Sequence, residues 1–202
     1  MIGINFIITC FDKEAFWPHL KDLILSYREI VPYIAFCYNG KDENLKCEYR
    51  CENRGLQIGD GQLIAGGYNH LKGNGVHKWI KLSVDSWLCN ERIIIEYFKE
   101  MEILKHHYMG CIWKNDHQAY STDVIFADTF FMKTFVENFK HDGKILEKYA
   151  FEVTQKTGGV GLIKERVVRD DLTRDNCPAL GWTMDHDLQK NIEFLNKFQV
   201  GL

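Results

Sequence analysis

The chain has 202 residues, of which 46% are hydrophobic, and this is enough to bury one sizeable core, so we expect one domain. The net charge of −3, without a basic block, argues against a nucleic-acid binder that relies on phosphate contacts. No apolar run approaches the ~20 residues that a membrane span needs. The run from Ile4 to Phe11 meets Asp12 at once and lacks a basic segment before it, so we expect a buried strand there and not a signal peptide.

The cysteines indicate a reducing compartment. There are seven of them, an odd number scattered along the chain, which favours a cytoplasmic protein with free thiols. Cys47 and Cys51 lie four residues apart, but no second Cys/His pair follows at the spacing of a zinc finger. We therefore interpret them as alternate residues of a strand and not as zinc ligands.

The first fifty residues follow the pattern of a strand–helix–strand unit. Residues 4–10 carry apolar side chains on both faces, as in a central parallel strand that is buried on both faces. Apolar residues then recur at helical spacing over 13–28, with Pro18 tolerated only in the first turn. Strands are expected over 31–37 and 45–51, and the crossover between parallel strands should be right-handed.

A glycine-punctuated loop, residues 52–61, precedes a helix that carries Leu63, Ile64, Tyr68 and Leu71. Glycines allow the backbone to approach a ligand closely, but the loop matches neither common phosphate-loop pattern, so an ordinary turn explains it equally well.

The segment 78–88 contains the most informative acid. Trp79, Ile80 and Leu82 form a strand-like run, and Asp85 follows where this strand should end. A carboxylate at the end of a buried strand is costly unless the site needs charge, and ligands bind at such strand ends in open α/β sheets. Alternatively, Asp85 caps a following helix. The residues of this segment leave both interpretations open.

The rest of the chain should continue with helices and strands. Helices are expected over about 90–105 and over 146–155, the second ended by Gly158 and Gly159. Asp128 suits the N-cap of a third helix and Asp185 that of the last one. The third helix is expected to carry Phe130, Phe131, Phe135 and Phe139.

Strands are expected over 107–113, 121–126 and 160–168. Residues 169–179 read as a polar loop with two acidic pairs. No repeat, low-complexity tract or linker divides the chain.

The stretch from Leu82 to Leu88, Leu-Ser-Val-Asp-Ser-Trp-Leu, resembles the "LDADDWL" segment, the DxD motif, of GT-A-type nucleotide-sugar glycosyltransferases. Ser83 stands where the motif has its first aspartate. The order of elements over residues 4–90 is similar to that in the nucleotide half of family-2-like glycosyltransferases. Residues 52–55 match the Glu-Asn-x-Gly loop of these enzymes. The resemblance implies a single α/β GT-A-like domain with a mostly parallel central sheet flanked by helices. Residues 1–90 would form its nucleotide-binding half and residues 91–202 its acceptor-binding half.

The resemblance also implies a metal ion, Mn²⁺ or Mg²⁺, that neutralises the departing pyrophosphate. Asp85 occupies the strongest metal-binding position of the motif, whereas Ser83 offers only a neutral oxygen, which puts metal dependence in doubt. Related enzymes often complete the metal shell with a C-terminal histidine, and His186 fits this role. An equally good interpretation of His186 is a solvated side chain in an acid-rich turn.

The nucleotide-sugar donor is expected at three consecutive strand ends that face one crevice. Short or glycine residues there would let the nucleotide approach the backbone. The expected contacts are Thr9, Cys10, Phe11, Asp12, Asn39, Asn53, Gly55, Asp60, Ser83, Val84 and Asp85.

Two acids are candidates for the base that activates the acceptor hydroxyl. Asp123 begins an apolar run where related enzymes contact the acceptor, and Glu152 lies in an aromatic setting that could raise its pKa. A helix cap or a surface charge explains either residue at least as well.

The leading hypothesis is a glycosyltransferase that moves a sugar from a nucleotide-sugar donor, with a UDP-sugar as the expected donor, to a glycan or glycoprotein acceptor. The alternative is a catalytically degenerate GT-A-fold module that binds nucleotide sugars or acts as a scaffold. A nucleotidyltransferase is a weaker third option, because the residues after the first strand, from Thr9 to Asp12, are neither glycine-rich nor basic.

Overall fold

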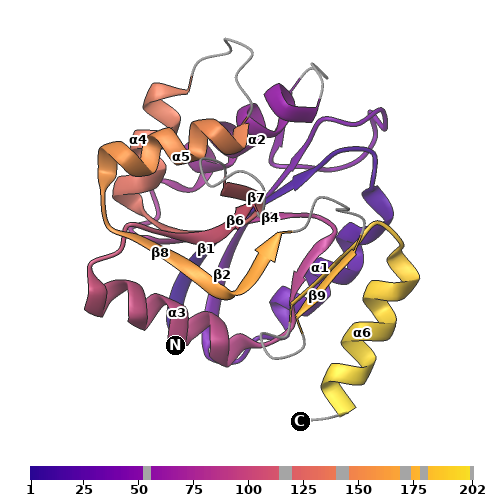
Figure 1. Ribbon diagram of the computed structural model, residues 1–202. Helices are drawn as coiled ribbons and strands as arrows, with labels where there is room; N and C mark the ends of the chain where they lie inside the picture. Colours follow the sequence, from indigo (N-terminus) through magenta and orange to yellow (C-terminus); the bar gives the residue numbers. More distant parts are fainter. Residues whose placement is uncertain (52–55, 114–119, 140–145, 169–173, 178–181, 201–202) are drawn as a thin grey trace.

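The computed structural model describes the chain except for residues 52–55, 114–119, 140–145, 169–173, 178–181 and 201–202. The described part is built on a seven-stranded sheet (Figure 1) with the order β3-β2-β1-β4-β7-β6-β8. β7 is antiparallel to β4 and β6, and the other neighbours are parallel. The predicted α/β class with a mostly parallel sheet is confirmed. The strands are β1 (Ile2–Cys10), β2 (Ile30–Tyr38), β3 (Tyr49–Arg50), β4 (Lys78–Ser83), β6 (Tyr108–Trp113), β7 (Tyr120–Asp128) and β8 (Val160–Val168).

Helices cover both faces of this sheet, which explains why β1 carries apolar side chains on both of its faces. Phe6 and Ile8 pack on one face with α1 (Trp17–Leu25), α3 (Glu91–Leu104) and α6 (Leu188–Val200). Ile7 packs on the other face with α2 (Leu56–Leu71), α4 (Thr129–Asn138) and α5 (Leu146–Thr157). As predicted, residues 4–10 lie in the interior of the sheet, between β2 and β4.

A second, small antiparallel sheet joins the middle of the chain to its last segment. Its order is β5 (Ser86–Leu88), β10 (Trp182–Asp185) and β9 (Arg174–Cys177). β5 starts one residue after Asp85, and β10 ends one residue before His186. The small sheet therefore brings the end of β4 and the C-terminal segment together.

Helix starts follow local side-chain chemistry. Asp128 accepts a hydrogen bond from the Phe131 backbone and caps α4 as predicted, and Asn90 caps α3 in the same way. Pro18 lies in the first turn of α1. Phe130 and Phe131 both lie on α4 as predicted, and Phe130 is 51% exposed whereas Phe131 is buried.

Several sequence-based expectations need correction. Asp85 caps no helix, because β5 follows it and α3 begins only at Glu91. Asp185 ends β10, and its side chain accepts a hydrogen bond from the Asp187 backbone at 2.9 Å instead of capping α6. Part of the polar loop expected over 169–179 is the strand β9.

The strand expected over 45–51 is reduced to two residues, Tyr49 and Arg50. The Glu48 carboxylate accepts the backbone N–H of Phe36 at 2.7 Å, and the Glu48 N–H donates to the Phe36 carbonyl at 2.9 Å. Glu48 thus holds the chain beside β2 just before β3 begins.

Of the helices in the described part of the chain, none combines the length and apolar character that crossing a membrane requires.

Candidate functional site

A cavity of about 250 Å³ opens at the carboxyl ends of β1 and β4. Because β7 is antiparallel to β4, its first residues lie at the same edge of the sheet. The cavity lining contains these residues predicted from the sequence: Thr9, Cys10, Phe11, Asn39, Asp60, Ser83, Val84, Asp85, Asp123 and His186. It also contains five residues that the sequence did not single out: Lys13, Leu63, Thr122, Leu146 and Glu147.

Two predicted residues do not line the cavity. Asp12 is exposed with a φ of 49°, and this left-handed turn reverses the chain after β1. Glu152 is exposed on α5, whereas Glu147, at the start of the same helix, reaches the cavity. Asn53 and Gly55 lie outside the described residues.

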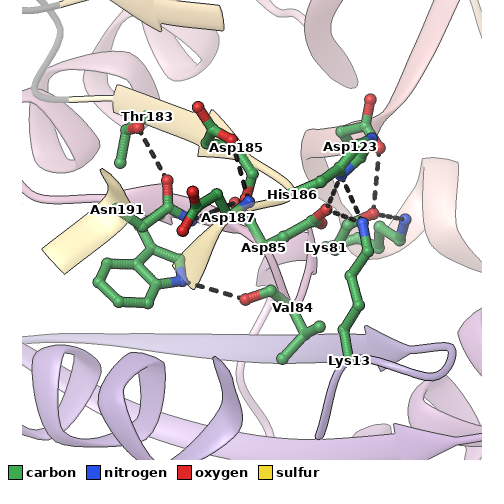
Figure 2. A network of polar contacts seen from close by, with 12 residues as sticks. Lys13, Lys81, Val84, Asp85, Asp123, Thr183, Asp185, His186, Asp187 and Asn191 are labelled. Atoms are coloured by element: carbon green, nitrogen blue, oxygen red, sulfur yellow. Dashed lines mark hydrogen bonds and ion pairs between the residues drawn. The ribbon is translucent and has the colours of Figure 1, made fainter. Parts of the chain in front are cut away.

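Three polar side chains from distant parts of the chain converge at the end of β4 (Figure 2). The Lys13 ammonium donates to Asp85 Oδ2 and lies within hydrogen-bond distance of His186 Nδ1. His186 Nδ1 lies 2.7 Å from the same oxygen of Asp85. We call these three residues the polar triad.

The backbone around Asp85 is fixed from two sides. The Val84 N–H donates to the Thr9 carbonyl at 2.9 Å, which continues the pairing of β1 with β4. Asn191, fully buried on α6, donates from Nδ2 to the Asp85 carbonyl at 2.9 Å. Its Oδ1 accepts from the Thr183 hydroxyl of β10 at 3.0 Å (Figure 2). Asn191 therefore couples the last helix to the position of the triad.

The electrostatics of the triad favour an ionised Asp85. Burial raises the pKa of this carboxyl, but the hydrogen bond with His186 and the positive charge of Lys13 lower it by more, to below the ordinary value of 3.8. The site therefore holds a buried carboxylate at neutral pH.

The triad fits a divalent metal ion poorly. Mg²⁺ takes oxygen ligands at about 2.1 Å, and an ion at this distance from Asp85 Oδ2 would lie beside the Lys13 ammonium. Among the described residues, no group of three or more His, Cys, Asp or Glu side chains is placed to hold a metal. Asp85 and His186 do come together as the sequence predicted, but the Lys13 ammonium contacts both of them.

A second network lies beneath the cavity and explains the unusual Ser83. The fully buried Lys81 ammonium donates to Asp60 Oδ2 at 2.9 Å and to the Ser83 hydroxyl at 3.1 Å. The Ser83 hydroxyl in turn donates to Asp123 Oδ1 at 3.2 Å, and the Ser121 hydroxyl donates to Asp123 Oδ2 at 2.9 Å. Ser83 thus links a buried cation to the candidate base.

Asn39, at the end of β2, offers a free amide to the cavity. Its side chain is 1% exposed, and neither amide atom has a hydrogen-bond partner among the described residues. Gly59 permits this position, because a Cβ there would lie 2.2 Å from Asn39 Nδ2. A buried amide without partners is costly, so a polar ligand would stabilise it.

The sequence signals for the residues that were missed are weak. Lys13 and Lys81 each look like a solvated charge in the sequence, and Asn191 occupies an inward position of α6 between Leu188 and Ile192. Among these three residues, only Asn191 gave a usable signal, because it is a polar residue on an apolar helix face.

Comparison with known proteins gives a fold but no close relative. No family model matches the sequence, and no curated protein matches it. Among solved structures, the mannosyltransferase PcManGT from Pyrobaculum calidifontis, in complex with GDP-Man and Mn²⁺, matches 79% of this chain with a TM-score of 0.56 and 8% identity. The chain spans 54% of that protein's length.

Two further structures extend this result. Residues 1–349 of S. aureus TarS, in complex with UDP-GlcNAc, match 83% of this chain and 57% of their own length, with a TM-score of 0.54 and 10% identity. A protein from Bacillus anthracis described as a glucose-1-phosphate thymidylyltransferase matches 97% of this chain and 96% of its own, with a TM-score of 0.52 and 12% identity. The chain therefore has the GT-A-type fold of nucleotide-sugar transferases.

Proposed function

We propose that this protein is a glycosyltransferase that uses a nucleotide-sugar donor. The observation that carries the proposal is the polar triad of Lys13, Asp85 and His186 at the strand ends, facing a cavity that also holds the Asn39 amide. Ligands of open α/β sheets bind at such strand ends. PcManGT and TarS, which share the fold, were solved with sugar nucleotides.

In this proposal, different residues of the cavity contact different parts of the donor. The base lies toward Asn39, whose amide offers one donor group and one acceptor group to a base edge. The diphosphate lies over Lys13, the positive end of the triad. The sugar then points toward Asp123 at the start of β7. A uracil base fits the Asn39 amide, so a UDP-sugar is the first donor to test.

Asp123 serves as the general base in this proposal. Its carboxylate takes the proton of an acceptor hydroxyl, and the hydroxyl oxygen forms a bond to the anomeric carbon of the sugar. The bond from that carbon to the diphosphate oxygen breaks, and the nucleoside diphosphate leaves with the electron pair. A glycan or glycoprotein acceptor would enter on the side of residues 91–202, past Glu147 of α5.

A metal ion takes no part in these steps. Asp85 and His186 are the residues of the described chain that would hold Mn²⁺ or Mg²⁺, and such an ion would supply positive charge to the diphosphate. The Lys13 ammonium already neutralises the Asp85 carboxylate through Oδ2, one of the two oxygens that such an ion could take.

A nucleotidyltransferase is the second candidate function. Lys13, directly after the turn that follows β1, supplies the basic group that the sequence alone did not place there. The fold match to the thymidylyltransferase also spans nearly the whole of both chains. The two reactions differ in their products, a nucleoside diphosphate in one and pyrophosphate in the other.

A binding panel followed by product analysis tests the proposal. Thermal unfolding is measured with UDP, GDP, ADP, CDP and dTDP, their common sugar conjugates, and the matching triphosphates with sugar 1-phosphates. We expect one nucleoside diphosphate and its sugar conjugate to raise the Tm of the wild type. The same compounds should raise the Tm of the Asn39→Leu variant by a smaller amount. Products of the stabilising pair are then identified, and release of pyrophosphate would favour the nucleotidyltransferase. No shift with any compound would contradict both functions.

A further inference from the structure

We propose that the Lys13 ammonium replaces the divalent metal ion, so that this protein binds the donor diphosphate without a metal. The inference rests on the proposed function and specifies how its site holds the diphosphate. It departs from what the DxD-like segment predicts, because that segment implies a metal held by Asp85.

The hydrogen bonds of the triad occupy one oxygen of Asp85, Oδ2, and one ring nitrogen of His186, Nδ1. Asp85 Oδ2 accepts from Lys13 and lies 2.7 Å from His186 Nδ1, so both sides of this oxygen are occupied. Lys13 has three N–H donors, and Asp85 and His186 take at most two of them. The third remains for a phosphate oxygen in the cavity that Lys13 lines.

Burial places the cation where a ligand meets it first. The Asp85 side chain is 6% exposed, whereas the Lys13 side chain is 29% exposed. An anion that enters the cavity therefore meets the more exposed ammonium, while the buried carboxylate holds the ammonium in place. This is the arrangement that a metal bound to the same carboxylate would produce.

The backbone presents Lys13 in a fixed position. The left-handed Asp12, with φ of 49°, turns the chain back after β1, and the Phe16 N–H donates to the Lys13 carbonyl at 3.1 Å. Lys13 is thus held between the end of a central strand and a short 3-10 helix, Glu14–Phe16. A pre-positioned cation loses little side-chain entropy when it binds a phosphate.

The partner acid of the metal motif is also replaced. Ser83 stands at its position, and its hydroxyl is engaged by Lys81 and Asp123. The Asp123 carboxylate accepts from both Ser83 and Ser121. Ser83 therefore supplies no carboxylate oxygen beside Asp85.

Isothermal titration calorimetry tests this inference on the whole chain. The probes are UDP, GDP, ADP, CDP and dTDP, each titrated in EDTA and again with excess Mn²⁺. The nucleoside that corresponds to the diphosphate that binds is titrated as well. We expect the diphosphate to bind with a Kd in EDTA within about twofold of the Kd in Mn²⁺. Lys13→Met should weaken the diphosphate at least tenfold and leave the nucleoside unchanged, and Lys13→Arg should recover part of the loss. Lys133→Met, an exposed lysine of α4, is the matched control and should bind as the wild type does.

The outcomes separate this inference from the proposed function. Diphosphate binding that requires Mn²⁺, or that Lys13→Met leaves intact, overturns the replacement of the metal but keeps the nucleotide site. Absence of diphosphate binding in both EDTA and Mn²⁺ overturns the nucleotide site itself. Because the metal comparison uses the wild type alone, it decides the question even if Lys13→Met does not fold.

Discussion

Lys81 shows how a single buried charge can be tolerated in the central sheet. Its side chain is fully buried on β4, yet its ammonium donates to Asp60, Ser83 and the carbonyl of Thr122. A buried lysine without such partners would be strongly destabilising. The three hydrogen bonds use all of its donors and fix the residues beneath the cavity.

We predict that Lys81→Met lowers the free energy of unfolding by about 3 kcal/mol, because it leaves the mostly buried Asp60 carboxylate without its cation. Adding Asp60→Asn should recover a large part of this loss. Lys78→Met is the matched control on the same strand, because its ion pair with the exposed Glu102 should contribute less than about 1 kcal/mol. Urea unfolding measures all of these, and an equal effect of the Lys78 and Lys81 variants would contradict the role of the buried network.

The sequence predicted those site residues that belong to a local pattern. Asp85 follows a recognisable strand, and the acid-rich segment around His186 stands out in the sequence. Lys13 could not be predicted, because its partner Asp85 is 72 positions away and its partner His186 is 173 positions away. Asn191 acts through the Asp85 carbonyl across 106 positions. Contacts of this length depend on the fold and leave no periodic signal.

At the scale of elements, α2 lies close against the central strands because it carries glycines. A Cβ at Gly67 would lie 2.6 Å from Ile7 Cγ2 and 3.0 Å from Cys37 Sγ. Ile7 and Cys37 are fully buried on β1 and β2, so neither can move aside easily. The close packing sets the height of α2 above the cavity, which Asp60 and Leu63 of this helix line.

We expect Gly67→Ala to destabilise the protein, although alanine favours a helix by about 1 kcal/mol over glycine. Overpacking of a well-packed core costs roughly 1–3 kcal/mol, so the net loss should be about 1 kcal/mol. The control is Gly73→Ala, since nothing lies within 4 Å of a Cβ there. Chemical unfolding should show a loss for Gly67→Ala only, and a stabilised Gly67→Ala would show that α2 can shift.

The elements that could be predicted were those with an internal signal. Apolar periodicity and a capping side chain located α3 and α4, and Gly158, with φ of 65°, marks the end of α5. The small sheet could not be predicted, because β5 has three residues and pairs with β10 almost a hundred positions later. Strands this short carry no alternation that a sequence pattern can detect.

At the scale of the whole molecule, the site is assembled from segments that span nearly the full chain. β1 delivers Lys13, β4 delivers Asp85, the antiparallel β7 delivers Asp123, and the small sheet delivers His186 (Figure 2). The triad therefore exists only when both sheets have formed. This dependence makes Asp85, which contacts both the β1 segment and the C-terminal segment, the residue on which the account depends most.

The most direct test of the account is the release of nucleoside diphosphate from a nucleotide-sugar donor, with water as acceptor, compared between the wild type and Asp85→Asn. We predict that Asp85→Asn lowers kcat/KM at least 100-fold, because the carboxylate that holds Lys13 against the diphosphate is lost. The fold should persist, as checked by circular dichroism and Tm.

Asp187→Asn is the matched control, since asparagine can accept the same hydrogen bond from the Gln189 N–H and the side chain lies outside the cavity lining. It should retain the wild-type rate within about twofold. Donor turnover by Asp85→Asn at the wild-type rate would contradict the account, and so would a wild type that releases nucleoside diphosphate from no donor.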